Sequence, residues 1–253
     1  MKPGVGELPI GALLCDADGC LFPSEEPAFD ACAEVTNGFL AELGSSRRFS
    51  GEALRLATTG MNFRTTASRL AAAEGRALEP AALAGWVESE QRAVTAHLAT
   101  VLRPDPLVSE PLERLAAGHA LALVSSSAAG RIDVCLQATE LQELFPRERR
   151  FSAESSLPVP TSKPDPAIYL HALARLGLEP ERALAVEDSI PGAESAIAAG
   201  CPTIGNVMFV PSEERAERRQ ALERAGVVEV VSSWGELELL LEPIELRGAG
   251  VSA

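Results

Sequence analysis

LLCDADGCLFPSE, residues 13 to 25, is the most informative stretch of the sequence. An apolar run from Ala12 to Cys15 leads into two aspartates one residue apart, Asp16 and Asp18, and then into Gly19. The run predicts a buried strand, and the glycine frees the turn that places both carboxylates on a loop. One carboxylate there can attack while the other carries a proton, with a divalent cation screening their repulsion. Taken alone, the same residues fit an aspartate-rich turn after a buried strand equally well.

The composition is that of an acidic globular protein. The 253 residues suffice for one large α/β domain or for two smaller ones, and 46% of them are hydrophobic. The formal net charge of −14 disfavours nonspecific binding to nucleic acid or to anionic membranes. It also means that a phosphorylated ligand would need local positive charge or a metal. The five cysteines include no C-x-x-C pair, which favours free thiols in a reducing compartment.

The sequence also indicates where the protein works. No apolar run approaches the roughly 20 residues of a membrane span. The N-terminal MKPGVGELPIGALLC is broken by proline and glycine and lacks the charged-then-apolar layout of a signal peptide. We therefore expect a cytoplasmic protein, monomeric or dimeric, with neither a membrane nor a nucleic acid as partner.

The periodicity of apolar residues changes along the chain. No strand-like alternation is found between Leu21 and Arg103, and the prolines of RPDP (103 to 106) suit a linker. Beyond it, short apolar runs alternate with helical segments, which predicts a parallel sheet with helices on both faces. We expect an α/β, Rossmann-like core of residues 1–22 and 104–253 with an all-helical domain, residues 23–103, inserted after the first strand. The expected later strands are 119–127, 149–154, 183–189, 201–206 and 227–231, and the expected helices are 28–43, 50–58, 64–74, 80–100, 108–117, 129–143, 166–177, 191–199 and 213–225.

Reactive residues follow several of these strands. Ser125 ends the second strand, and Glu187 and Asp188 end a later one. Because the carboxyl ends of parallel strands meet at one edge of a sheet, we expect them to lie near Asp16 and Asp18. Such a carboxylate set suits Mg²⁺, and the hydroxyl of Ser125 with nearby amides could hold a phosphate. The alternatives are an ordinary strand-end serine and acids that merely favour a helix start.

Lysine usage singles out one further position. Of the 22 basic residues, only Lys2 and Lys163 are lysines. Lys163 lies in TSKPDPAIYL, on a loop before a helix. An ammonium there could neutralise a carboxylate and a transferring phosphoryl group together. The alternative is a solvated surface lysine.

In order and spacing, these four segments resemble the motifs of the haloacid dehalogenase-like hydrolase superfamily, whose members are mostly phosphatases. The motifs are hhhhDxDGTL, a strand ending in serine or threonine, a lysine, and a strand ending in acids. The helical insert is similar to the cap of the β-phosphoglucomutase-like and phosphoglycolate-phosphatase-like branch. KPDPAIYLHALARLGLEPERALAVEDSIPGAESAIAAG (163 to 200) resembles that branch closely.

The resemblance implies a role for each core residue. Asp16 would be the nucleophile that forms an aspartyl-phosphate, and Asp18 the acid/base that protonates the leaving group and then activates water. Ser125, with Ser126 beside it, would hold the phosphoryl oxygens, and Lys163 would stabilise the transition state. The implied Mg²⁺ ligands are Asp16, the backbone carbonyl of Asp18, and Asp188, assisted by Glu187.

The resemblance also extends to the cap. TTGMNFR (58 to 64) matches the glycine-containing loop that the family lowers over the active site. Asn62 and Arg64 are therefore expected to meet the substrate. The alternative is that Arg64 is an exposed residue at a helix start.

Departures from the motifs narrow the expected reaction. Cys20 replaces the usual threonine, while Asp18, which dehalogenases of the superfamily lack, favours phosphoryl transfer. Leu21 to Arg103 contains no lysine for phosphonate cleavage. A mutase would have aspartate, histidine and lysine at three positions; here these are Pro23, Ala28 and Ala128, with Arg131 as a candidate to compensate.

We therefore expect a Mg²⁺-dependent phosphatase for a small phosphorylated metabolite of the sugar phosphate or phosphoglycolate type. The alternatives are a phosphosugar mutase and a non-catalytic binding or regulatory member of the fold.

Overall fold

The structure is a computed structural model that describes residues 9–58 and 61–242. The chain divides into two compact units, one of Met1–Phe22 with Arg103–Ala253 and one of Pro23–Leu102. We call them the core unit and the helical unit. Residues 1–8 of the N-terminal segment, and Thr59 and Gly60 of the TTGMNFR loop, lie outside the described residues.

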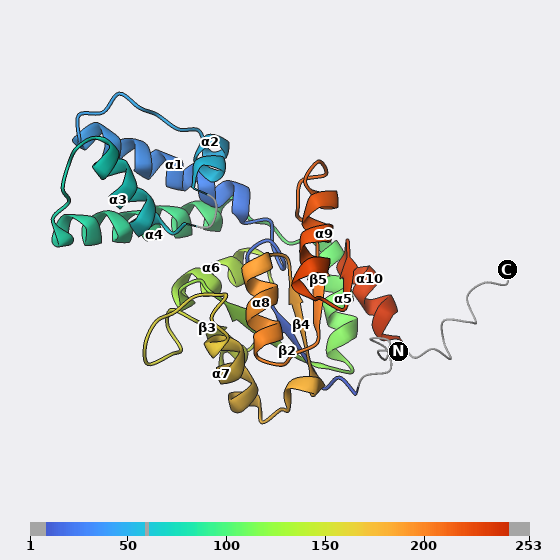
Figure 1. The fold of residues 1–253 in the computed structure, drawn as a ribbon. Coiled ribbons are helices and arrows are strands. Elements are labelled where there is room, and N and C mark those ends of the chain that lie inside the picture. The colour runs from blue at the N-terminus through green and yellow to red at the C-terminus, as the bar shows by residue number, and fades with distance from the viewer. Residues whose placement is uncertain (1–8, 59–60, 243–253) are drawn as a thin grey trace. The chain divides into compact units, whose positions relative to one another are not determined.

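A fully parallel sheet forms the centre of the core unit (Figure 1). Its order is β3-β2-β1-β4-β5-β6, so that β1 lies between β2 and β4. The order reverses direction between β1 and β4, which is where open α/β sheets bind their ligands. This confirms the expected α/β, Rossmann-like fold. The strands are β1 (Ala12–Cys15), β2 (Ala120–Ser125), β3 (Arg150–Ser152), β4 (Ala183–Glu187), β5 (Thr203–Asn206) and β6 (Glu229–Val231).

Helices cover both faces of this sheet (Figure 1). Helices α7 and α8 pack on one face, where Tyr169 and Ala196 join a buried cluster with Leu14 of the central strand. Helices α5 and α10 pack against each other on the opposite side. Burial on both faces explains why the central strands are continuous apolar runs. The core-unit helices are α5 (Pro106–Ala116), α6 (Ala129–Ala138), α7 (Ala167–Leu176), α8 (Ile190–Ala198), α9 (Arg215–Ala225) and α10 (Trp234–Leu241), with short 3₁₀ turns at Arg147–Arg149 and Pro180–Arg182.

Two features of the core unit differ from the sequence expectation. Helix α6 ends at Ala138 instead of residue 143, because Glu140 takes a left-handed conformation with φ of 59°. Helix α10 was not predicted. Its Trp234 is fully buried, and the indole Nε1 donates a hydrogen bond to the carbonyl oxygen of Cys20 at 3.1 Å. Helix α10 therefore braces the loop that carries Asp16 and Asp18.

The helical unit has its own apolar core. Phe39, Phe63 and Leu70 belong to its buried cluster, and Trp86 packs edge-on against Phe39 with ring centroids 5.6 Å apart. Such a geometry is favourable for aromatic pairs. The helices are α1 (Glu25–Glu42), α2 (Gly51–Ala57), α3 (Phe63–Ala73) and α4 (Pro80–Val101). Across the described part of the chain, no helix is both long and apolar enough to cross a membrane.

Candidate active site

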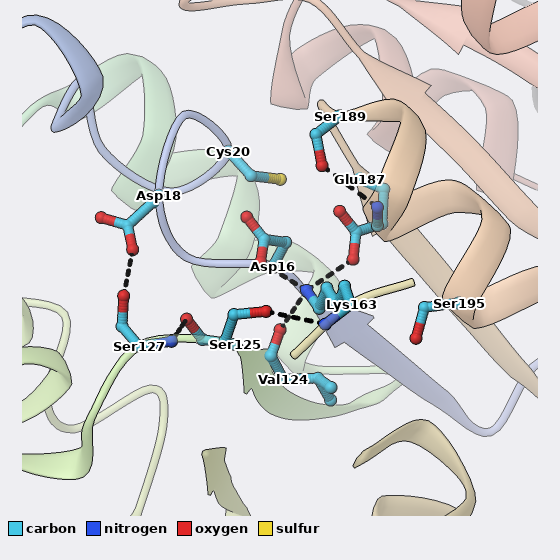
Figure 2. Close-up of polar contacts among 12 residues, drawn as sticks. Asp16, Asp18, Cys20, Val124, Ser125, Ser127, Lys163, Glu187, Ser189 and Ser195 are labelled. Atoms are coloured by element: carbon cyan, nitrogen blue, oxygen red, sulfur yellow. Dashed lines mark hydrogen bonds and ion pairs between the residues drawn. The ribbon is translucent and has the colours of Figure 1, made fainter. Parts of the chain in front are cut away.

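Three charged side chains meet beyond the carboxyl ends of β1 and β4 (Figure 2). The Nζ of Lys163 lies 2.5 Å from Oδ1 of Asp16 and 2.6 Å from Oε1 of Glu187. It also donates to the carbonyl oxygen of Val124, at 2.8 Å. Only 6% of the Lys163 side chain is exposed, so it is not a solvated surface lysine. The loop before α7 thus places one cation between two strand ends.

Burial and charge set the electrostatics of this group. Burial raises the pKa of Asp16 from its ordinary 3.8 to about 7, with Lys163 opposing the rise and Glu187 adding to it. Burial acts to lower the pKa of Lys163, but the two carboxylates outweigh it and raise that pKa. Lys163 is therefore held as an ammonium ion, whereas Asp16 becomes a carboxylate only near neutral pH.

A buried hydroxyl completes the surroundings of Glu187. The hydroxyl of Tyr169, on α7, donates a short hydrogen bond to Oε1 of Glu187. The Nζ of Lys163 lies 5.3 Å from the centroid of the same ring. Burial, together with Glu187, raises the pKa of Tyr169 well above its ordinary value. Oε1 therefore accepts from two donors, while Oε2 of this fully buried carboxylate has no hydrogen-bond partner among the residues that the structure describes.

The carboxylates can also form a metal site. Oxygen atoms of Asp16, Glu187 and Asp188 lie within 4.8 Å of one another. Hard oxygen donors of this kind suit Mg²⁺, and a cation would satisfy the unpartnered Oε2. Lys163 and Arg218, whose Nη1 lies 3.9 Å from Oδ2 of Asp188, supply two positive charges against these three carboxylates, so a negative charge remains that a divalent ion would balance. The donor set therefore fits a hard divalent cation.

Two glycines let the acids approach the backbone this closely. A Cβ on Gly19, where φ is +77°, would lie 2.3 Å from Oδ2 of Asp188. A Cβ on Gly192 would lie 1.8 Å from Oε2 of Glu187. Helix α8 begins beside them, where Ser189 accepts a hydrogen bond from the Gly192 amide at 3.2 Å and so acts as the N-cap.

Asp18 faces a different set of donors. Its Oδ2 accepts a hydrogen bond from the hydroxyl of Ser127 at 2.6 Å (Figure 2). Its Oδ1 lies 2.8 Å from Nη2 of Arg131, in the first turn of α6. Asp16 and Asp18, although one residue apart, thus contact different cations.

The serines after β2 hold the loops together. Ser125 is buried at the end of β2, and its hydroxyl oxygen accepts a hydrogen bond from the Ser127 amide at 3.0 Å. The hydroxyl oxygen of Ser126 accepts from the backbone amide of Lys163 at 3.1 Å. The serine segment is therefore connected directly to the lysine loop.

The cap candidates lie in the helical unit, at the start of α3. Asn62 is its N-cap, and the side-chain oxygen accepts from the Thr65 amide at 2.9 Å. Arg64 is exposed in the first turn of α3. Within the helical unit, Asn62 therefore caps α3, and Arg64 is an exposed residue at the start of that helix.

The sequence reasoning missed two residues that contact the acids. Tyr169 carried a signal, because it is the only tyrosine in the sequence and lies six residues after Lys163. Arg218, on α9, donates to the carbonyl oxygen of Asp188 at 2.9 Å. It gave no distinct signal, because it lies among the many charges of SEERAERRQALERAG, residues 212 to 226.

Comparison of the chain with known proteins finds similarity to hydrolases. The haloacid dehalogenase-like hydrolase family matches residues 10–200. A phosphoglycolate phosphatase of Thiobacillus denitrificans is 31% identical over 199 residues, which cover 77% of this chain and 82% of that protein. The CbbY protein of Rhodobacter capsulatus is 32% identical over 208 residues, covering 81% of this chain and 86% of CbbY.

A solved structure shows the same similarity. The mutant CbbY of Rhodobacter sphaeroides, in complex with xylulose 1,5-bisphosphate, superposes with a TM-score of 0.68 at 27% identity. The match covers 90% of this chain and 96% of that one.

Proposed function

The chain belongs to the haloacid dehalogenase-like hydrolase family, and on this premise we propose that it is a Mg²⁺-dependent phosphatase acting through an aspartyl-phosphate on Asp16. The observation that carries the proposal is the 2.5 Å contact between Lys163 and Asp16, beside the acids of β4. An ammonium ion so placed steadies Asp16 as a carboxylate and attracts a phosphoryl group.

Two aspartates suffice for the proton and bond changes. A carboxylate oxygen of Asp16 attacks phosphorus, and the bond from phosphorus to the ester oxygen breaks while Asp18 gives that oxygen its proton. Asp18, now a carboxylate, takes a proton from water. The resulting hydroxide attacks phosphorus, and the bond to Asp16 breaks. The products are an alcohol and inorganic phosphate, and both aspartates return to their starting states.

We propose that the remaining residues of the site bind the metal ion and the phosphoryl oxygens. We propose that Asp16, Asp188 and the backbone carbonyl of Asp18 hold Mg²⁺, assisted by Glu187. When bound, the ion screens the repulsion between the carboxylates and the phosphoryl oxygens. Ser125 and Ser126 would hold those oxygens, since both lie at the end of β2 beside the lysine loop.

We propose a small phosphorylated metabolite of the sugar phosphate or phosphoglycolate type as substrate. Relatives named phosphoglycolate phosphatase and phosphorylated carbohydrates phosphatase support this class. The helical unit would act as a cap that selects the substrate, with Arg64 and Asn62 as its contacts. We propose the reducing cytoplasm as the setting, because all five cysteines are free thiols.

The proposal is tested by phosphate release from phosphoglycolate, a set of sugar phosphates and xylulose 1,5-bisphosphate, with Mg²⁺ or with EDTA. We expect turnover with Mg²⁺ only, and a wild-type protein that gains the mass of one phosphoryl group when quenched in acid. Asp16→Asn should lose activity by about 1,000-fold or more, because the nucleophile is gone. The matched control is Glu113→Gln, an exposed acid on α5, which should keep full activity.

Several results would contradict the proposal. Activity of Asp16→Asn equal to wild type would remove Asp16 from the chemistry. Mg²⁺ binding without release of phosphate from any ester would favour a binding protein. Conversion of β-glucose 1-phosphate to glucose 6-phosphate with a bisphosphate activator, faster than phosphate release, would favour a mutase.

A further inference from the structure

Arg131 occupies a position that helix stability does not explain. It is the third residue of α6, a helix with no acidic residue in its first turn and no side-chain cap. A cation there faces the positive end of the helix dipole, which is an unfavourable position for it. Its side chain is only 25% exposed, so solvent does not account for the position either. A specific anionic partner is therefore expected.

That partner is Asp18. Nη2 of Arg131 lies 2.8 Å from Oδ1, and the hydroxyl of Ser127 lies 2.6 Å from Oδ2, so each oxygen of the carboxylate has its own donor. Both distances are typical of charge-assisted hydrogen bonds. Two donors on opposite oxygens fix the direction of the carboxylate plane, which a single bond would leave free to turn.

The donors themselves are held in place. The amide of Ser127 donates to Oγ of Ser125 at 3.0 Å, and its carbonyl oxygen accepts from the hydroxyl of Ser152 at 2.7 Å. Asp18 is therefore connected to the same segment, 125–131, that begins with the proposed phosphate-holding serine. A proton carrier must lie within about 3 Å of the oxygen it serves, and a small misplacement costs much of its effect.

We propose that Arg131 is a positioning residue that, with Ser127, aims the carboxyl group of Asp18 at the leaving-group oxygen, and that it is not a ligand for a second anionic group of the substrate. The proposal rests on the proposed function, in which Asp18 carries the proton. A mutase would need a cation to bind the distal phosphate of its substrate. In this protein the guanidinium group of Arg131 is instead paired with Asp18.

The kinetic test compares Arg131→Met, Arg131→Lys and Ser127→Ala with wild type. Each is assayed on the best alkyl phosphate of the substrate screen, on xylulose 1,5-bisphosphate and on p-nitrophenyl phosphate. For the alkyl ester we expect Arg131→Met to lower kcat about ten-fold or more with KM within about two-fold, and Arg131→Lys to restore much of the loss. Ser127→Ala should fall between wild type and Arg131→Met. Arg147→Met, which removes an 83% exposed guanidinium from the same unit, should match wild type.

The leaving group separates positioning from mere structural support. p-Nitrophenolate departs with little need of a proton, so the loss in kcat/KM caused by Arg131→Met should be at least about three-fold smaller for that ester than for the alkyl ester. An equal loss for both esters would overturn the proposal. So would a rise in KM for the bisphosphate with kcat unchanged, or a lysine variant no better than the methionine variant.

A double-mutant cycle tests, without any substrate, whether Arg131 and Asp18 interact. Urea unfolding of Asp18→Asn, Arg131→Met and the double variant should show a coupling of about five-fold or more in the unfolding equilibrium constant. Additive effects would overturn the proposal. If the wild type released phosphate from no ester, the proposed function would fall, while the cycle would still show whether Arg131 holds Asp18.

Discussion

Removing the charge of Lys163 should destabilise the core unit strongly, by an amount that depends on pH. Lys163→Met keeps most of the side-chain volume but removes the ammonium ion 2.5 Å from Asp16 and 2.6 Å from Glu187. Two buried carboxylates then face each other without a counter-ion. Breaking a buried ion pair by deleting one partner costs about 3–5 kcal/mol, against a typical total stability of about 5–15 kcal/mol. We expect a loss in that range at about pH 8 without metal.

Acid should reduce this loss. Burial already raises the pKa of Asp16 to about 7 with Lys163 present, and removal of the lysine raises it further. The folded variant therefore takes up a proton more readily than the unfolded chain, so its stability falls as pH rises through neutrality. At about pH 5.5 the carboxyl group of Asp16 is largely protonated, and the difference from wild type should be at least about 1 kcal/mol smaller than at about pH 8.

Urea unfolding in EDTA measures both quantities. A Trp86→Phe background leaves Trp234, which is fully buried in the core unit, as the fluorescent reporter. Arg147→Met is the control, since its exposed pair with Asp133, at 3.4 Å, should contribute less than about 1 kcal/mol. A loss for Lys163→Met below about 1 kcal/mol at about pH 8, or a loss independent of pH, would refute the assignment of Lys163 as the buried counter-ion.

Three further outcomes are expected. Gly192→Ala should cost about 1–3 kcal/mol in urea unfolding, because the new Cβ would lie 1.8 Å from Oε2 of Glu187. Gly85→Ala, whose Cβ meets no atom of the described residues within 4 Å, should not destabilise the protein, and equal losses would contradict the packing argument. Mg²⁺ affinity measured by calorimetry should rise about ten-fold per pH unit up to about pH 7 and then level off, because binding requires the carboxylate of Asp16 and burial raises its pKa to about 7. A flat profile would show that Asp16 is not a ligand. Tyr169→Phe should cost about 1.5–3 kcal/mol, since the buried carboxylate of Glu187 loses a donor, and a change below about 0.5 kcal/mol would show that the hydroxyl adds little.

Much of the core fold could be predicted from the sequence, for a physical reason. Strands buried on both faces, such as β1 and β4, appear as continuous apolar runs, and their parallel pairing brings Asp16, Glu187 and Asp188 to one edge. Element ends were less predictable. The stop of α6 depends on a left-handed Glu140, and α10 is an eight-residue helix too short to show a clear period.

Which side chains form pairs could not be predicted, because pairing depends on how the helices pack on the sheet. From spacing alone, Lys163 could be either a site residue or a solvated surface lysine. In the structure its side chain is buried, because α7 packs on the sheet beside it. The same holds for Arg131. The sequence suggested it as a replacement for a missing lysine, whereas the start of α6 places it against Asp18.

Tyr169, whose hydroxyl contacts Glu187, is the only tyrosine of the chain. Biosynthetic incorporation of fluorotyrosine would therefore label this protein at one position, inside the proposed metal site, and give a single fluorine NMR signal. Its ring also lies beside the ammonium group of Lys163, so the chemical shift should respond to any redistribution of charge among the acids. Addition of magnesium and then of inorganic phosphate could be followed separately on this signal, in a protein that performs no turnover.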